Sequence, residues 1–380
     1  MGQCHRKSHG TEAAYGSAPP AGSTSSSSQV LPSPSDDAIS SVCPFGDRHF
    51  VASGSNGWVY FYDWQKATLD GKFRAHKKAV NQARTLDDGR LLTASNDSTV
   101  RLWAGSGNSA SALPIVAQTY DAGSAAGCLA TPALTFEGHD ISVVAMDLLD
   151  GASTDVGGPS ASSLLVTGSR DCSLRAWDLE TGRELRKLKI LRNVVTTLRR
   201  LPGSSSSIVQ ASEDLQLRLW DLSASGNQPA SAVHAGPNQL ICLDVSEDGR
   251  YVACGSKGFS RENCEVKVFD VRGGLRELSS KPCADQTIEA LRFAGPDRCL
   301  IASKDGFLRV VQLPEVSIVS ERGPAGAGYT ALGACRRSMP EGPVALSALS
   351  GPDGVRLEVL AWRDAVLESP ASLLAATETE

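Results

Sequence analysis

The stretch GSRDCSLRAWD, residues 168–178, decides the fold because close variants of it return along the chain. Three other stretches, NDSTVRLWA, EDLQLRLWD and KDGFLRVVQ, have the same order of residues and lead to an anchor equivalent to Trp177. These anchors are Trp103, Trp220 and Val311. In all four copies an aspartate lies six residues before the anchor: Asp97, Asp171, Asp214 and Asp305. A serine lies two residues before each aspartate: Ser95, Ser169, Ser212 and Ser303.

Two looser copies extend the series, with Tyr62 and Phe269 at the anchor position. The six anchors stand at positions 62, 103, 177, 220, 269 and 311, so most neighbours are 41 to 49 residues apart. A repeat of about 40–45 residues is typical of the four-stranded blades of a β-propeller. Because a single blade cannot bury its own apolar faces, the blades must close into one ring. We therefore predict an all-β, seven-bladed propeller.

The repeats resemble those of the WD40 repeat family, and the resemblance covers residues 38–368. Three longer stretches are similar to the WD repeat-containing protein 31 group: LRNVVTTL (191–198), QASEDLQLRLWDLS (210–223) and GFSRENCEVKVFDVR (258–272). The family resemblance implies that both chain ends help to close the ring. The group resemblance implies a cilium-associated role near regulators of small GTPases.

Composition divides the chain into a tether, a propeller and a tail. Residues 10–36 are rich in Ser, Ala, Gly and Pro and cannot bury enough apolar surface to fold, so residues 1–37 are predicted to be disordered. The propeller, residues 38–368, is interrupted by two insertions at 104–133 and 151–162, which we predict to be disordered surface loops. Residues 369–380 form the C-terminal tail.

The seventh blade is the least regular of the predicted blades. AGYTALGAC, GPVALSAL and GVRLEVLAW can supply three strands, with Trp362 near the anchor position. The outer strand can come from AVLES, which starts at Ala365, or from the N-terminal tether. The sequence leaves both sources open.

Charge and cysteine usage exclude several classes of protein. The net charge is −5 and the isoelectric point about 5.8, whereas nucleic-acid binders more often carry a basic stripe. The ten cysteines include no CxxC pair and no Cys/His pair at ligand spacing, so neither a zinc site nor a cofactor is predicted. No apolar run is long enough for a membrane-spanning helix, and no secretory signal opens the chain. These features favour a cytoplasmic protein with reduced thiols.

Serine, histidine and aspartate close to one another also resemble a hydrolase triad, but a catalytic set would occur once. In the WD40 family such residues form a hydrogen-bonded network inside each blade. The matching residues are His76, Ser95, Asp97 and Trp103 in blade two, and His139, Ser169, Asp171 and Trp177 in blade three. Blade four keeps Ser212, Asp214 and Trp220 but has Arg192 and Asn193 where the histidine loop should be, which predicts an incomplete network. We interpret these residues as structural, because buried polar groups must satisfy one another.

The exposed turns are the expected binding region, since a scaffold binds through its loops. The residue between each Ser and Asp, together with the loop entering each blade, places several cations on one face of the propeller. We expect this face to bind an acidic surface of a partner protein through Lys77, Lys78, Arg170, Arg192, Asn193, Lys257 and Lys304. Other basic residues lie two positions before the anchors and are expected to face solvent: Arg101, Arg175, Arg218, Lys267 and Arg309.

The N-terminal sequence MGQCHRKS indicates a lipid anchor. Removal of Met1 would expose Gly2 for myristoylation, and Cys4 beside it is available for palmitoylation. Arg6 stands where Ser or Thr is preferred, which departs from the usual motif. A single myristoyl chain binds membranes only marginally, so acylation of Cys4 is needed for stable attachment.

These observations predict a non-enzymatic scaffold for protein–protein interaction, possessing no metal or cofactor and located in the cytoplasm, at a membrane or at a cilium. Its partners are other proteins, with membrane contact through the acylated N-terminus and no nucleic acid. Two alternatives stay open. A substrate receptor of a ubiquitin ligase would need an adaptor-docking motif on the blades, and a propeller hydrolase would need carboxylates or histidines clustered on one face.

Overall fold

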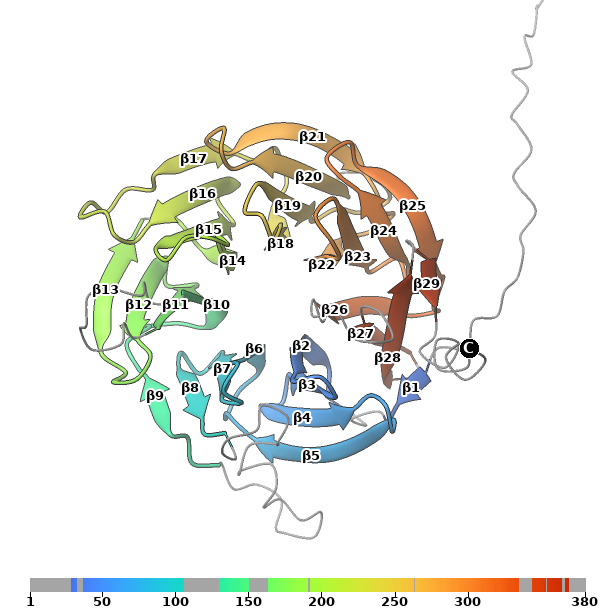
Figure 1. Cartoon of the computed structure of the whole chain (residues 1–380), viewed down its shortest axis with the longest axis horizontal. Coiled ribbons are helices and arrows are strands. Elements are labelled where there is room, and N and C mark those ends of the chain that lie inside the picture. Colours follow the sequence, from blue (N-terminus) through green and yellow to red (C-terminus); the bar gives the residue numbers. More distant parts are fainter. Residues whose placement is uncertain are drawn as a thin grey trace, which may run out of the picture.

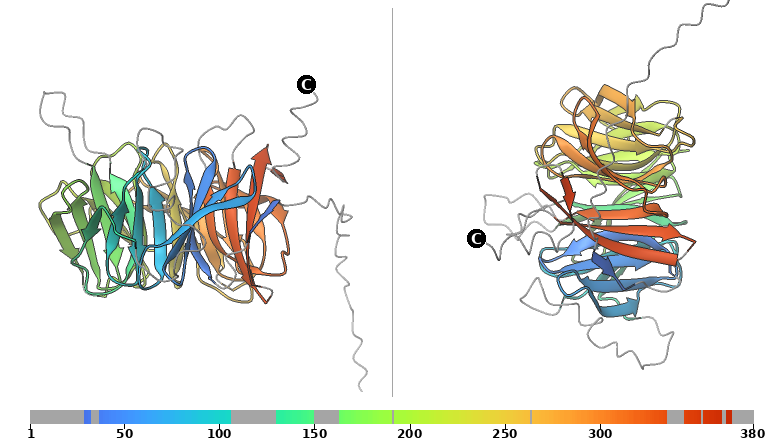
Figure 2. Two further views of the ribbon diagram at one scale, coloured as in Figure 1. Left: turned by 90° about the horizontal axis from the view of Figure 1, so that it is seen from below. Right: turned by 90° about the vertical axis from the view of Figure 1, so that its right-hand side faces the viewer.

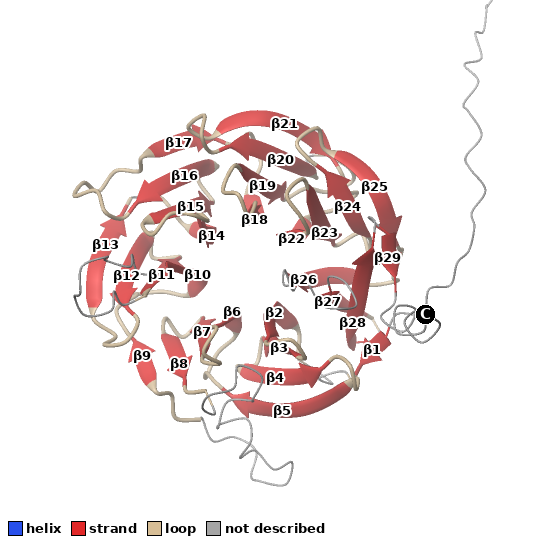
Figure 3. Ribbon diagram, in the orientation of Figure 1, coloured by secondary structure: helices blue, strands red, loops and turns tan. Residues whose placement is uncertain are grey.

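The computed structural model describes residues 29–32, 37–105, 130–149, 163–190, 192–262, 264–334, 344–352, 354–363 and 366–368. In these residues the regular secondary structure consists of β-strands that pair in antiparallel fashion (Figure 3). They form seven sheets arranged around a central axis, like blades of a wheel (Figure 1). Viewed from the side, the wheel is a flat disc (Figure 2). The predicted fold class is therefore confirmed.

Six blades consist of four consecutive strands, numbered from the channel outward. Blade one contains β2 (Ile39–Phe45), β3 (His49–Gly54), β4 (Trp58–Asp63) and β5 (Thr68–Arg74). Blade two contains β6 (Val80–Thr85), β7 (Leu91–Ser95), β8 (Val100–Trp103) and β9 (Leu134–Phe136). Blade three contains β10 (Val143–Leu149), β11 (Leu164–Ser169), β12 (Ser173–Asp178) and β13 (Glu184–Lys189).

The next three blades repeat this arrangement. Blade four contains β14 (Val195–Arg200), β15 (Ser207–Ser212), β16 (Gln216–Asp221) and β17 (Ser231–His234). Blade five contains β18 (Leu240–Val245), β19 (Tyr251–Ser256), β20 (Glu265–Asp270) and β21 (Arg276–Pro282). Blade six contains β22 (Ile288–Phe293), β23 (Arg298–Ser303), β24 (Leu308–Gln312) and β25 (Ser317–Arg322).

Blade seven joins the two ends of the chain. Its strands are β26 (Gly328–Ala334), β27 (Val344–Gly351), β28 (Gly354–Arg363), β29 (Val366–Glu368) and β1 (Gln29–Leu31). Both candidate outer strands pair with β28, at different places: β1 along Leu357–Val359 and β29 along Ala361–Arg363. Since β1 belongs to the first residues of the described chain, its pairing closes the ring (Figure 1).

This closure corrects the predicted limits of the tether. Residues 1–37 were expected to be disordered, yet Gln29–Leu31 form a strand, and Leu31 is buried against Trp64 and Leu357. The backbone N–H and C=O groups of this segment find partners on β28, which composition alone does not reveal. The remaining residues of the tether, apart from positions 32 and 37, lie outside the described residues, as does the tail at 369–380.

Asp37 is also part of blade one. Its carboxylate accepts hydrogen bonds from the Ser55 hydroxyl (2.9 Å), the Asn56 N–H (2.8 Å) and the Tyr60 hydroxyl (2.9 Å). A Cβ atom at Gly54 would lie 1.9 Å from the Asp37 carboxylate, so only glycine fits there. Blade one therefore has a buried acid in the segment that enters the blade, although its sequence lacks the repeated aspartate.

Apolar surface holds neighbouring blades together. Trp103, Trp177 and Trp220 are buried, as are the replacement anchors Tyr62, Phe269 and Val311. The ring of Trp177 packs at 5.9 Å from Phe136, at the end of the preceding blade. Such aromatic contacts bury a large area with defined geometry. The outer strands are more exposed because they have no neighbour on their outer side.

The two expected insertions fall at strand connections. Residues 104–133 separate β8 from β9, and residues 151–162 separate β10 from β11. Most of the first and all of the second lie outside the described residues. Within the described part of the chain, no helix has the length and apolar character needed to cross a membrane.

Candidate functional site: blade networks and the turn face

The triad-like residues of blade three form a closed internal network. His139 Nδ1 lies 2.9 Å from Asp171 Oδ2, and its Nε2 lies 2.8 Å from Thr167 Oγ1. The Trp177 Nε1–H donates to the same Thr167 oxygen at 2.9 Å. Blade two repeats this chain of contacts through His76, Asp97, Thr93 and Trp103, with distances of 2.8 to 2.9 Å. The hydroxyl that links histidine to tryptophan therefore comes from threonine.

This geometry corrects the expected role of Ser95 and Ser169. The Ser169 hydroxyl donates to the Ile141 carbonyl (3.1 Å) and accepts the Asp171 N–H (3.1 Å). Ser95 makes the equivalent bonds to Ala79 and Asp97. Both serines thus fasten a turn to the loop entering the blade. The linking residue was missed in the sequence, where its signal is a polar side chain ten residues before the tryptophan.

Blade four has a complete network built from different residues. Trp220 Nε1–H donates to Gln210 Oε1 at 2.9 Å, and Gln210 Nε2–H donates to Asn193 Oδ1 at 2.6 Å. Arg218 donates to the same Asn193 oxygen at 3.0 Å and pairs with Asp214, which also accepts the Ser212 hydroxyl. The expectation of an incomplete network was wrong, because amide and guanidinium groups replace the imidazole.

The burial of Asn193 also overturns its expected role in partner binding. The residue is 1% exposed, and its side chain is directed into the blade. A side chain inside the sheet cannot contact a protein docked on the turns. The neighbouring Arg192 is exposed and has a positive φ of 67°, so the chain turns inward between these two residues.

The basic residues two positions before the anchors were expected to face solvent, but their side chains are largely buried. Arg175, Arg218, Lys267 and Arg309 are each less than 8% exposed, and Arg101 is half-buried. Each is paired with an acid: Asp97 for Arg101, Glu184 for Arg175, Asp214 for Arg218, Glu265 for Lys267 and Asp305 for Arg309. A long cationic side chain inside a protein requires such a partner. Blades four and six have no histidine to contact the repeated aspartate, and there the arginine pairs with that aspartate instead.

Electrostatics keep the two network aspartates charged. Burial by itself raises the pKa of Asp171, but hydrogen bonds from His139, Ser173 and the Asp140 N–H outweigh it and hold the pKa well below its ordinary value. The pKa of Asp97 is lowered in the same way by His76 and Thr99, against the opposing effect of burial. A nucleophile must be reachable by substrate, whereas Thr167, Ser169 and Ser173 have no exposed surface. The arrangement stabilises the blade and offers no access for substrate.

The turns between the second and third strands lie beside the loops entering the blades. The same backbone bond joins them in blades one to six, as with Arg170 N–H to Ser142 O (3.1 Å) and Lys257 N–H to Gln239 O (2.8 Å). Because strands alternate in direction, all these turns lie on one side of the disc. We call this side the turn face and the other the opposite face.

The turn face carries most of the predicted partner-binding cations. Lys77, Lys78, Arg170, Arg192 and Lys257 are exposed there. Lys304 is also exposed, but its Nζ lies 2.9 Å from Glu289 Oε1 and is thereby partly neutralised. The predicted lipidation sites Gly2 and Cys4 lie outside the described residues.

An exposed aromatic residue lies next to Lys257. Phe259 is 65% exposed in the enlarged turn between β19 and β20. It borders a pocket of about 440 Å³ that Lys257, Asn238 and Glu262 also line. A large exposed apolar side chain beside charged groups is a common feature of binding surfaces.

One group of side chains in the described residues has donor atoms close enough for a metal ion. It consists of His49, Asp63 and Asp70, whose ligand atoms lie within 4.8 Å of one another. Asp63 Oδ2 accepts from Arg48 Nε at 2.6 Å, and its Oδ1 accepts the N–H groups of Gln65 and Lys66. His49 Nε2 lies 3.1 Å from Asp70 Oδ2. These contacts engage both oxygens of Asp63 and one nitrogen of His49, whereas the buried Nδ1 of His49 has no hydrogen-bond partner among the described residues.

Comparison with known proteins agrees with this geometry. The family model described as WD domain, G-beta repeat, matches residues 25–63, 67–104 and 130–178. Nuclear distribution protein PAC1 of Arthroderma otae is 31% identical over 161 residues, which are 40% of this chain and 29% of that protein. Mitochondrial division protein 1 of Saccharomyces cerevisiae is 29% identical over 142 residues, 37% of this chain and 18% of that protein. Pre-rRNA-processing protein crb3/ipi3 of Schizosaccharomyces pombe is 30% identical over 136 residues, 35% of this chain and 27% of that protein.

The aligned parts are less than a third of the length of these relatives. Their names refer to three different cellular processes, so the similarity supports the repeat architecture and not one pathway. The names of these relatives do not support the resemblance to the WD repeat-containing protein 31 group. Together, the seven blades and their internal networks show a β-propeller, and its matched segments within residues 25–178 are similar to WD40 repeats.

Proposed function

We propose that the protein is a non-enzymatic scaffold that binds an acidic surface of a partner protein through its turn face. The observation that carries this proposal is the set of exposed cations on one side of a rigid disc in a chain with a net charge of −5. Complementary charge speeds encounter and selects partners, while aromatic residues supply much of the binding energy. Phe259 beside Lys257 offers both contributions at one place.

The experiment is a pull-down from cells with full-length protein carrying Arg170→Glu and Lys257→Glu. We expect partner recovery to fall while the unfolding temperature stays unchanged, because both side chains are exposed. The matched control is Arg183→Glu with Arg272→Glu, which makes the same charge change in exposed turns of the same two blades on the opposite face. Equal recovery with both double variants would show that the turn face is not the binding surface.

We further propose that acylation of Gly2 and Cys4 tethers the scaffold to a membrane, and that it works at a cilium near regulators of small GTPases. The support for the tether is the sequence MGQCHRKS, and the support for the location is the resemblance of three stretches to the WD repeat-containing protein 31 group. Proximity labelling with the full-length chain and with Gly2→Ala tests both ideas. An unchanged membrane fraction for Gly2→Ala would contradict the proposed tether. Labelling that recovers no ciliary proteins would contradict the proposed location.

A further inference from the structure

The innermost strands of the seven blades share one irregularity that aligns their side chains. Each contains a β-bulge at its second residue, apart from β26, where it lies one residue later. We take the residue directly before each bulge, such as Val143 in β10, and count four residues onward, which gives one equivalent position per blade. Around the ring these positions are Cys43, Arg84, Asp147, Arg199, Asp244, Arg292 and Gly333. We call this set the arginine layer.

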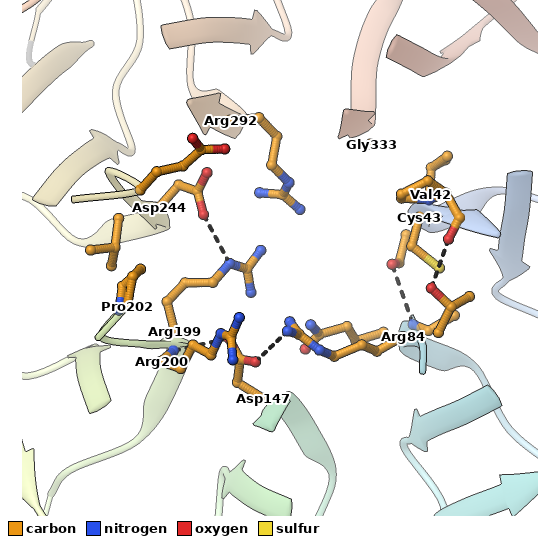
Figure 4. Close-up of a pocket in the computed structure, with 17 residues that line it drawn as sticks. Val42, Cys43, Arg84, Asp147, Arg199, Arg200, Pro202, Asp244, Arg292 and Gly333 are labelled. Atoms are coloured by element: carbon orange, nitrogen blue, oxygen red, sulfur yellow. Dashed lines mark hydrogen bonds and ion pairs between the residues drawn. The ribbon is translucent and has the colours of Figure 1, made fainter. Parts of the chain in front are cut away.

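All seven residues of the arginine layer line one pocket in the central channel (Figure 4). The pocket has a volume of about 450 Å³, which is within the range of small-molecule sites. Arg200 and Glu247 also line it. The guanidinium groups of Arg199 and Arg292 are directed toward the middle of the pocket from different blades (Figure 4).

The two aspartates of the layer are occupied by the protein backbone. Asp147 accepts the Leu148 N–H at 2.6 Å and the Arg200 N–H at 2.9 Å. Asp244 accepts the Phe293 N–H at 2.9 Å. Both carboxylates are buried, and each bonds to the innermost strand of the following blade. They also pair with arginines, Asp147 with Arg84 (2.7 Å) and Asp244 with Arg199 (3.3 Å).

The side chains that line the pocket carry more positive than negative charge. Four arginines face three acids, Asp147, Asp244 and Glu247, which leaves one net positive charge in a chain of net charge −5. Each guanidinium presents five N–H donors. One nitrogen of Arg199 donates to the Leu198 carbonyl (3.1 Å) and one nitrogen of Arg292 to the Leu291 carbonyl (2.7 Å). Planar guanidinium groups bind phosphate and carboxylate oxygens in pairs of parallel hydrogen bonds. The complement of this lining is a compact group rich in anionic oxygens.

Space for such a group lies on the side where the layer has small residues. Cys43 and Gly333, from neighbouring blades, are the two members of the layer without a long side chain, so neither extends far into the pocket. Closer to the turn face, the channel is lined by Ser40, Asn81, Thr196 and Thr330, and its one acid, Glu289, pairs with Lys304. Arg199 and Arg292 line this part of the channel too, so both guanidinium groups border the two levels of the channel.

From these contacts we propose that the arginine layer binds a small molecule carrying two or more phosphate groups. Several converging guanidinium groups suit phosphate better than a single carboxylate, because each phosphate offers three oxygens to different donors. The phosphates can belong to a soluble metabolite or to a lipid headgroup. This site does not involve the turn face, so a negative result for the site would leave the proposed function unaffected.

The experiment titrates full-length protein with inorganic tripolyphosphate by isothermal calorimetry. We expect saturable binding of one molecule per chain, weakened about tenfold or more in Arg292→Gln and in Arg199→Gln. Arg272→Gln is the matched control, since it removes the same charge from an exposed turn between β20 and β21. Equal weakening in all three variants, or no saturable binding below millimolar concentration, would overturn the proposal.

A second measurement needs no variant and covers the case in which a substitution unfolds the chain. Native protein is treated with phenylglyoxal, and modified arginines are identified by mass spectrometry. We expect tripolyphosphate to protect Arg199 and Arg292 while Arg272 reacts as before. Equal reaction with and without the probe would contradict the site. The same reaction is then repeated with vesicles of phosphatidylcholine, with and without a phosphoinositide. Protection of Arg199 and Arg292 by the phosphoinositide vesicles would identify the ligand as a lipid headgroup. Protection by soluble phosphate alone would identify it as a metabolite.

Discussion

The side chains of Gln210 and Asn193 are joined by a 2.6 Å hydrogen bond inside blade four. They occupy the places that Thr167 and His139 take in blade three, where the corresponding distance is 2.8 Å. A pair of amides thus performs the task of a hydroxyl and an imidazole, because each pair supplies one acceptor to the buried tryptophan N–H and one link to the blade entrance. What is preserved from blade to blade is the satisfaction of these buried groups.

Asn193→Ala should destabilise the protein by about 1–3 kcal/mol, because it removes the acceptor shared by Gln210 and Arg218 and leaves buried donors without a partner. The measurement is the free energy of unfolding in denaturant. Arg192→Ala is the control, and its exposed side chain should change stability by less than about 0.5 kcal/mol. Equal stability of both variants would show that the amide network contributes nothing.

Thr167→Val should cost about 1–3 kcal/mol, because the Trp177 N–H and His139 Nε2 both lose their partner in a fully buried site. Thr167→Ser keeps the hydroxyl and loses one methyl group, so the expected loss is smaller, about 1 kcal/mol. Thermal unfolding followed by tryptophan fluorescence compares the two. If valine proved as stable as threonine, packing and not hydrogen bonding would determine this position.

Stability should fall in acid because the pKa values of Asp97 and Asp171 are held below their ordinary value in the folded protein. In the unfolded chain an aspartate has a pKa of about 3.9. A lowered folded pKa contributes stability above the unfolded pKa, and this contribution is lost as the pH falls through the folded pKa. The double variant Asp97→Asn with Asp171→Asn should be less stable at neutral pH and show a shallower decline below about pH 4. Unfolding free energies measured from pH 7 downward test this, and parallel curves for the two proteins would contradict it.

Leu31→Ala should destabilise the propeller by about 2–4 kcal/mol, because this buried side chain packs the closing strand β1 against blade seven. Val30→Ala is a control in the adjacent position, where the side chain is 51% exposed, and should have little effect. Unfolding temperatures of the two full-length variants provide the measurement. Similar values would mean that β1 does not hold the ring closed.

The sequence alone determined the number of blades and the anchor of most of them. These features follow from a period of about 40 residues and from local spacings, such as the six residues between Asp171 and Trp177. Local spacing sufficed because each turn fastens itself to its own blade through Ser169 and its equivalents.

Only the tertiary structure decided which side chains meet across these strands. Thr167 reaches Trp177 from the neighbouring strand, Asn193 turns inward while Arg192 points out, and Gln29–Leu31 join a blade more than 300 residues away in sequence. The arginine layer likewise exists only because seven bulges bring residues from seven blades to one level of the channel. Pairings between distant segments depend on register and burial in the closed ring, which the order of residues within one repeat does not specify.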